Sequence, residues 1–148
     1  MHRFTSNKGV EFIKSFESFS PTKYICAGGK MTIGYGHVLL QNEHYEGISM
    51  DMADKILLHD LIKAEMAVSR NIKIHLEQSQ FDALVSFAFN LGSGALQRSA
   101  LRQKINYGAA IEEIQHEFMR WVYAGGRRLG GLVRRREAES AMFAMAGG

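Results

Sequence analysis

Glu17 has the sequence context of a carboxyl group that could donate a proton. It lies between Phe16 and Phe19, at the C-terminal end of a helix predicted over Lys8–Glu17. Apolar neighbours and the negative end of a helix dipole both disfavour a carboxylate, so they favour the protonated form that a general acid needs near neutral pH. The alternative is an ordinary, partly exposed glutamate at a helix end, and the local context alone leaves both interpretations open.

Cys26, the only cysteine, is the second residue whose type suggests chemistry. A single cysteine excludes an internal disulfide and a cysteine-based zinc site. Its thiolate would be a nucleophile, but a lone cysteine is also commonly a small buried hydrophobic residue. The six histidines show no metal-ligand spacing, so we expect no metal site.

The elements that would position these residues follow from hydrophobic periodicity and from glycines. Apolar positions three or four residues apart predict helices, whereas residues 19–47 contain alternating positions and turn signals such as Gly28-Gly29, which predict short antiparallel strands. Glycines such as Gly125-Gly126 and Gly130-Gly131 separate the later helices. The predicted helices are Lys8–Glu17, about 50–70 after the N-cap Ser49, Glu77–Leu91 with a buried central stretch from Phe81, Gly94–Ile105, Ala109–Tyr123 and Leu132–Ala146. The fold class is therefore α+β, with a small antiparallel sheet lobe joined by a long helix to an all-helical lobe.

The composition is that of a globular protein. The chain has 148 residues, of which 46% are hydrophobic and 22% are charged, and no apolar run approaches the roughly 18 residues of a membrane span. The polar, basic segment Met1–Asn7 predicts that no signal peptide is present. Residues 119–148 contain six arginines and two glutamates, a net charge of +4, whereas residues 1–118 carry a net charge of −1. This asymmetry predicts an anionic partner: nucleic acid, a membrane surface or a bacterial envelope polymer.

The motifs around Glu17 and Cys26 resemble those of the phage-type lysozymes, glycoside hydrolase family 24. That family has Phe-Glu-Gly near its N-terminus, and Thr-Ile-Gly-Tyr-Gly-His after an aspartate or cysteine. The corresponding residues here are Phe16-Glu17-Ser18, Cys26 and Thr32–His37, and the downstream matches are Phe87–Gly92, Ser99, Trp121 and Gly131–Glu139. The chain departs from the family at four positions. Cys26 occupies a position where many members have aspartate, Ser18 replaces a glycine, and Pro21 and Lys23 replace an apolar and a small residue.

The resemblance implies one lysozyme-like domain over residues 1–148, with a sheet lobe at about 18–48, a connecting helix at about 50–70 and a helical lobe at about 71–148 that includes the N-terminal helix. It implies a cofactor-free muramidase that cleaves the β-1,4 bond between N-acetylmuramic acid and N-acetylglucosamine. Glu17 would protonate the glycosidic oxygen. Cys26 would stabilise or attack the cationic sugar or activate a water, and Thr32 would position that water.

Further residues match family positions that contact the sugar: Val38, Phe89, Asn90 and Ser99. For Phe89 the alternative is core packing, and for Asn90 it is a helix C-cap beside Gly92.

His37 and Asp60 form a second predicted constellation, with a structural role. Asp60 falls at the edge of the apolar face of the connecting helix, where a carboxylate needs a partner, and His37 is the natural one. The alternative is that both side chains reach solvent. Of the three arginines that begin the last helix, we expect Arg135 to reach Glu17 and orient it. Arg134 and Arg136, with Arg127 and Arg128, would face anionic envelope polymers, and the alternative for each arginine is an ordinary solvated basic face.

Three functions remain open at this point. The favoured one is a monomeric lysozyme that serves phage or prophage lysis, accumulates in the host cytoplasm, and acts on periplasmic peptidoglycan after another protein has permeabilised the membrane. The second is a lysozyme fold that binds peptidoglycan without cutting it, which the cysteine at position 26 keeps open. The third is a nucleic-acid-binding protein, supported only by the basic C-terminal region; no recognised module interleaves basic and aromatic residues, so we expect no specific nucleic-acid partner.

Overall fold

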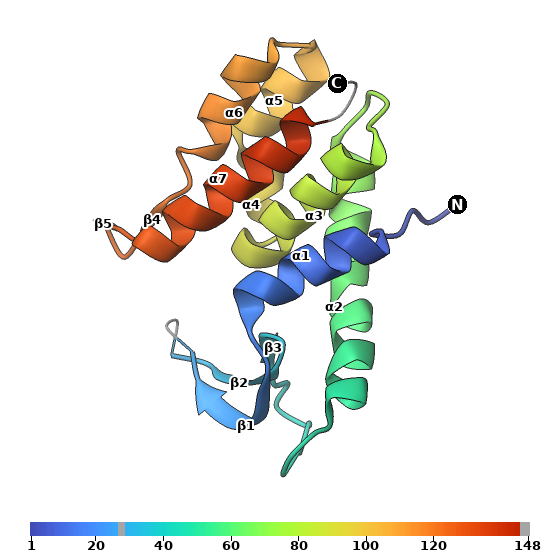
Figure 1. Cartoon of the computed structure of the whole chain (residues 1–148), viewed down its shortest axis with the longest axis vertical. Helices are drawn as coiled ribbons and strands as arrows, with labels where there is room; N and C mark the ends of the chain where they lie inside the picture. Colours follow the sequence, from blue (N-terminus) through green and yellow to red (C-terminus); the bar gives the residue numbers. More distant parts are fainter. Residues whose placement is uncertain (27–28, 146–148) are drawn as a thin grey trace.

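The fold is organised around helix α3 (Gln78–Leu91), in a computed structural model that describes residues 1–26 and 29–145. Every residue of Phe81–Ala88 is buried, because α1 (Asn7–Glu17), α2 (Met50–Asn71) and α7 (Gly130–Ala144) pack around this helix (Figure 1). A helix that is apolar all round is stable only when it is covered all round. The predicted buried central helix is therefore confirmed.

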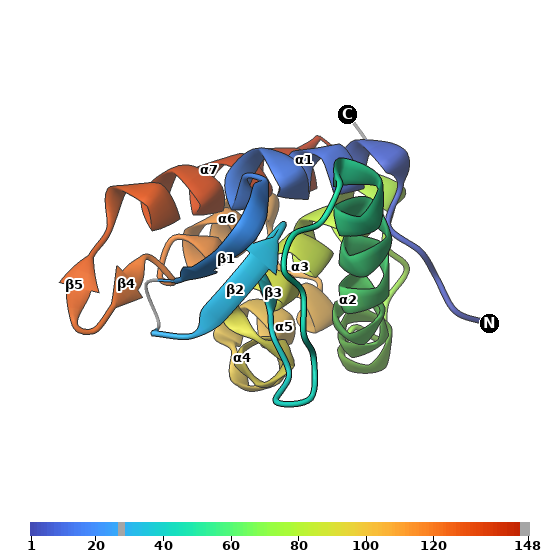
Figure 2. The ribbon, with the colours of Figure 1, turned by 90° about the horizontal axis from the view of Figure 1, so that it is seen from below.

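The sheet consists of three short antiparallel strands in the order β1 (Ser20–Ile25), β2 (Met31–Gly34) and β3 (His37–Val38). Helix α2 begins beside this sheet, contacts β2 and β3, and continues along the helical region (Figure 2). The predicted α+β class is confirmed. Of the turn predicted at Gly28-Gly29, Gly28 lies outside the described residues.

The single helix predicted over Gly94–Ile105 is wrong, because two helices occupy this stretch. α4 (Ser93–Arg98) and α5 (Ala100–Tyr107) meet at Ser99, whose backbone is extended at φ −79° and ψ 147°. The Ser99 hydroxyl accepts a hydrogen bond from the Arg102 N–H and donates one to the Leu96 carbonyl, at 3.0 and 2.8 Å. A serine in this position caps the new helix, which ends the old one.

The helix predicted over Ala109–Tyr123 is too long. α6 (Ile111–Phe118) ends early, and a hairpin follows in which β4 (Tyr123–Ala124) pairs with β5 (Arg127–Arg128). Its turn is Gly125-Gly126, with φ values of 59° and 78°, and two positive values are what a type I′ hairpin turn requires. Helix α7 begins at Gly130 instead of Leu132, and its predicted end at Ala146 lies outside the described residues.

The core between these helices is aromatic at its centre. The Phe87 ring of α3 lies 5.8 Å from the Phe118 ring and 5.6 Å from the Trp121 ring, and Phe143 of α7 packs on Phe118. This cluster fixes α7 against α3, the two helices that carry the polar residues discussed below. None of the helices in the described ranges is both long and apolar enough to cross a membrane.

Candidate active site

A cavity of about 500 Å³ lies between the sheet, α2 and the C-terminal end of α3. Its lining includes the three predicted catalytic residues and five further predicted site residues: Glu17, Cys26, Thr32, His37, Val38, Asp60, Phe89 and Asn90. A second cavity of about 530 Å³ extends towards α7, and it shares Glu17 and Asn90 with the first. Glu17 therefore lies where the two cavities meet.

The backbone at Ser18 and at Gly36 fixes Glu17 in this position. Ser18, the residue after it, ends α1 with φ 58°, and its N–H donates to the Lys14 carbonyl at 3.0 Å. That positive φ is one that glycine adopts without strain, which explains why the phage-type lysozymes have glycine at this position. On the other side, Gly36 lies so close that a Cβ there would overlap Glu17 Oε1. The turn between β2 and β3 thus packs directly on the carboxyl group.

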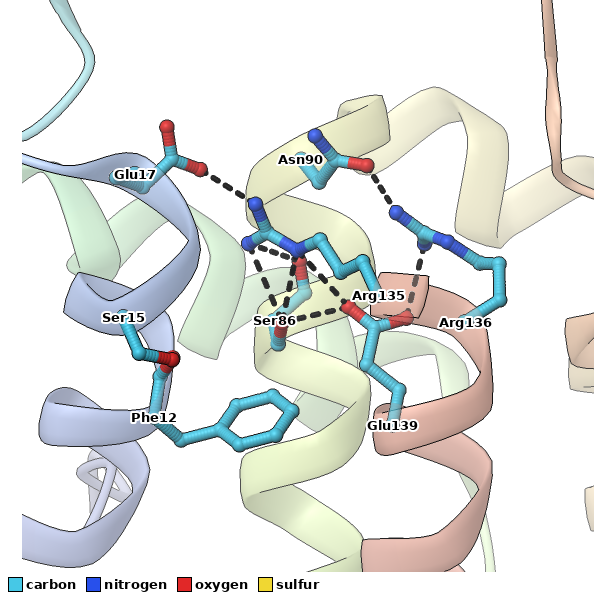
Figure 3. A network of polar contacts seen from close by, with 8 residues as sticks. All are labelled: Phe12, Ser15, Glu17, Ser86, Asn90, Arg135, Arg136 and Glu139. Carbon is cyan, nitrogen blue, oxygen red and sulfur yellow. Dashed lines mark hydrogen bonds and ion pairs between the residues drawn. The ribbon is translucent and has the colours of Figure 1, made fainter. Parts of the chain in front are cut away.

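Arg135 is the arginine that reaches Glu17 (Figure 3). Its Nη1 donates to Glu17 Oε2 at 2.6 Å, its side chain is 5% exposed, and its guanidinium lies 5.5 Å from the centroid of the Phe16 ring. Because Arg135 occupies Oε2, a proton on Glu17 has to be carried by Oε1, the oxygen beside Gly36. The ion pair therefore selects which oxygen can donate.

The expectation that Arg136 faces envelope polymers is wrong. Arg136 is fully buried, pairs with Glu139 at 2.9 Å, and donates to the Asn90 side-chain oxygen. Burial lowers its pKa to about 10, against the opposing charge of Glu139, which still leaves it charged near neutral pH. Arg127, Arg128 and Arg134 are exposed.

A single carbonyl holds Cys26 and Thr32 in place. The Lys30 carbonyl accepts hydrogen bonds from the Cys26 backbone N–H and from the Thr32 hydroxyl, both at 2.9 Å. Because the Thr32 hydrogen is used in this way, the hydroxyl oxygen is left with acceptor capacity only, in a residue that lines the cavity. Thr32 is 2% exposed and Cys26 is half-buried, so the pair forms part of the cavity wall instead of an open surface.

Sequence reasoning missed Tyr24, which also lines the cavity. Tyr24 and Cys26 are two residues apart on and just beyond β1, and Tyr24 lies opposite Thr32 in the sheet register, so strand alternation could have found it. Burial raises the pKa of Tyr24, and the charges of Glu17 and Cys26 raise it further. Tyr24, Glu17 and Cys26 all line this cavity.

His37 and Asp60 are brought together, and a third residue joins them. His37 Nδ1 lies 2.6 Å from Asp60 Oδ2, and its Nε2 lies 3.0 Å from Glu43 Oε1, which also accepts from the Leu40 N–H at 2.7 Å. Burial by itself lowers the pKa of His37, but the hydrogen bonds and charges of Asp60 and Glu43 outweigh it, so the net pKa lies above 6.5. For Glu43, the Leu40 N–H is the largest influence, and it lowers the pKa of that carboxyl. This cluster ties the sheet to α2.

The position of Ser99 differs from the one inferred from the family. It is 1% exposed, its hydroxyl makes the helix-capping bonds described above, and it is not among the residues that line either cavity. Within residues 1–26 and 29–145, no group of three or more histidine, cysteine or acidic side chains is arranged to hold a metal ion.

Comparison with known proteins gives consistent matches. Residues 14–139 match the Phage lysozyme family. The endolysin of Bacillus phage B103 is 40% identical over 140 residues, which cover 93% of this chain and 53% of that protein, so this chain spans about half its length. The endolysin of Acyrthosiphon pisum secondary endosymbiont phage 1 is 37% identical over 142 residues, or 93% of this chain and 96% of that protein. Among solved structures, the muramidase domain of SpmX from Asticaccaulis excentricus is 34% identical with a TM-score of 0.85, covering 97% of this chain and 98% of that one.

Proposed function

The chain belongs to the phage lysozyme family, and from that premise we propose that it is a muramidase of phage or prophage lysis. Its substrate is peptidoglycan, cleaved at the β-1,4 bond between N-acetylmuramic acid and N-acetylglucosamine. The observation that carries this proposal is the position of Glu17, at the junction of two cavities, with one oxygen bound by Arg135 and the other against Gly36. A glycan strand that spans both cavities would bring a glycosidic oxygen to that junction.

Glu17 is the proposed general acid. The side chain reaches the cavities from the end of α1, and Oε1 is the oxygen that remains to carry the proton. Protonation of the leaving oxygen produces an oxocarbenium-like sugar, which requires a negative or nucleophilic group on the opposite face.

Cys26 and Thr32 are proposed to supply that opposite face. As a thiolate, Cys26 would stabilise the cationic sugar, attack it, or activate a water. Thr32 would hold the water, because its own hydrogen already goes to the Lys30 carbonyl and its oxygen can accept one from the water. Both groups share that one carbonyl, which fixes their separation along the wall of the cavity.

Sugar recognition is proposed to involve Asn90, Phe89 and Val38, all of which line the cavity. An amide side chain suits N-acetyl groups, which both donate and accept hydrogen bonds. We further propose that the exposed Arg127, Arg128 and Arg134 attract anionic envelope polymers, and that the enzyme acts as a monomer. Membership of the family supports the proposed route, from the host cytoplasm to the periplasmic wall after another protein permeabilises the membrane.

The experiment that tests the proposed function is a turbidity assay with Glu17→Gln on permeabilised Gram-negative cells. The amide has almost the same shape but has no acidic proton to give, so we expect a loss of roughly a hundredfold or more in the rate of clearing. The control is a thermal unfolding curve of the same sample, which separates loss of chemistry from loss of fold. Clearing within a few-fold of wild type by a folded variant would overturn the assignment of Glu17.

A further inference from the structure

Glu139 is a buried carboxylate at the centre of the polar network between α3 and α7 (Figure 3). Its Oε2 lies 2.5 Å from the Ser86 hydroxyl and 3.3 Å from Arg135 Nε, and its Oε1 lies 2.9 Å from Arg136 Nη1. Burial raises the pKa of Glu139, while the charges of both arginines and the Ser86 hydroxyl oppose that rise. A buried charge of this kind persists only where partners surround it.

Both arginines that bind Glu139 also donate hydrogen bonds to residues that line the cavities. Arg135 joins it to Glu17 through the 2.6 Å hydrogen bond to Oε2, and Arg136 joins it to Asn90 through a hydrogen bond to the side-chain oxygen. Glu17 and Asn90 are the two residues of this set that line both cavities. One carboxylate is therefore connected, through two guanidinium groups, to the proposed acid and to a proposed sugar contact.

The network also decides how Asn90 is presented. Because Arg136 binds the oxygen of the amide, the nitrogen is turned away from Arg136, as Figure 3 shows. An amide without this partner could present either its donor or its acceptor to a ligand. With Arg136 in place, Asn90 offers its donor, which suits the carbonyl of an N-acetyl group.

We propose that Glu139 is a positioning residue, which holds Glu17 through Arg135 and Asn90 through Arg136 in one fixed geometry. This inference rests on the proposed function, since it gives a role to the orientation of the acid. Small errors in the placement of a reacting group cost large factors in rate. The buried position of Glu139 thus serves the chemistry as well as the fold.

A purely structural role would produce the same burial, so the test needs a matched control. Glu117 of α6 provides one: its side chain is 3% exposed, and it pairs with Lys104 at 3.0 Å and Arg120 at 3.4 Å. It lines neither cavity. Each of the two glutamates pairs with two cations, so Glu117→Gln and Glu139→Gln remove the same kind of buried charge. Only Glu139 is connected, through Arg135 and Arg136, to residues that line both cavities.

The experiment compares Glu139→Gln, Glu117→Gln and Ser86→Ala with wild type on solubilised peptidoglycan fragments, well below each melting temperature. Release of reducing ends gives kcat and KM per folded enzyme. We expect Glu139→Gln to lower kcat by about tenfold or more and to raise KM, and Glu117→Gln to keep both within about twofold. We also expect the alkaline limb of the pH–rate profile to move to lower pH in Glu139→Gln alone, because Arg135 then acts on Glu17 without an opposing anion.

Each outcome decides between the two roles. If Glu139→Gln does not fold, Ser86→Ala takes its place, since it removes the hydroxyl that binds both Glu139 and Arg135; a lower kcat with the fold intact supports positioning. The proposal is overturned if folded Glu139→Gln has the kcat, the KM and the alkaline limb of wild type. If only Ser86→Ala folds, the proposal is overturned by a wild-type kcat in that variant. If wild type itself releases no reducing ends, the proposed function fails instead.

Discussion

Replacing His37 by asparagine should destabilise the protein in a pH-dependent way. In the folded chain His37 donates to Asp60 and Glu43 at 2.6 and 3.0 Å, which occupies both ring nitrogens and therefore requires the imidazolium. Its pKa is raised above 6.5. The stabilisation from His37 is therefore complete below about pH 6.5, the value in the unfolded chain, and is lost as the pH rises through the folded-state pKa.

Glu43 sets the lower boundary of this window. Its pKa is lowered, first by the Leu40 N–H and also by His37, so its contribution is present above about 4.5 and is lost as the pH falls through the folded value. The cluster should contribute most between these limits, and pH 5.5 lies within them.

The size of the effect follows from the exposure of the three side chains. His37 is 11% exposed, and Asp60 and Glu43 are each 22% exposed. Removing one partner of a fully buried pair costs about 3–5 kcal/mol, and hydrogen bonds to charged groups contribute about 1.5–3 kcal/mol each. With partial exposure we expect a loss of roughly 3 kcal/mol at pH 5.5, which for a chain of this size lowers Tm by about 6–12 °C.

The assay is thermal unfolding of wild type, His37→Asn, Asp60→Asn and the double variant at pH 5.5 and 9.5. His44→Asn is the control, because His44 is an exposed histidine on the loop that follows β3, next to Glu43. The Tm difference between wild type and His37→Asn should be largest at pH 5.5 and should shrink at pH 9.5, and the double-variant cycle should show coupling between His37 and Asp60. Equal Tm values at pH 5.5, or a difference that is the same at both pH values, would refute this reasoning.

Two other changes test local features of the site. Ser18→Gly should raise Tm by about 2–4 °C, corresponding to roughly 1 kcal/mol, because φ 58° strains serine but not glycine; an unchanged or lower Tm in a melting curve would show that this residue is not strained. Cys26→Asp should keep substantial lytic activity and Cys26→Ser should be much weaker, because only the former places a negative charge at the sugar cation; full activity in both Cys26→Ser and Cys26→Ala would leave Cys26 with a packing role only.

Local sequence signals predicted the features that depend on local order. Phe81–Ala88 predicted the buried helix because its residues other than Asp82 and Ser86 are apolar and lie on nearly every side of a helix. The spacing of Glu17, Cys26 and Thr32 carried the family resemblance, and all three line one cavity.

The sequence could not predict features that depend on tertiary packing. The break at Ser99 depends on a hydroxyl that bonds backbone on both sides, and the β4–β5 hairpin depends on two positive φ values that a glycine pair permits but does not dictate. Arg135, Arg136 and Glu139 have the spacing of a solvent-exposed, salt-bridged helix face. Their burial arises only when α7 packs on α3.

The interactions of the exposed arginines and of the buried ones should respond differently to salt. Arg127 and Arg128 lie on the exposed strand β5, and any attraction to anionic polymers through them would weaken as ionic strength rises. Arg135 is buried against Glu17 and Glu139, so its interactions are far less screened by salt. High salt should thus weaken attraction to anionic polymers more than it alters the Arg135–Glu17 contact.

The most direct measurement of the central claim is mass spectrometry of purified peptidoglycan digested by wild type and by Glu17→Gln. Cleavage of the proposed bond leaves N-acetylmuramic acid at the reducing end of every new fragment. We predict such fragments in the wild-type digest and their loss in the digest by the folded variant. Fragments that end in reducing N-acetylglucosamine, or equal yields from the two proteins, would contradict the account.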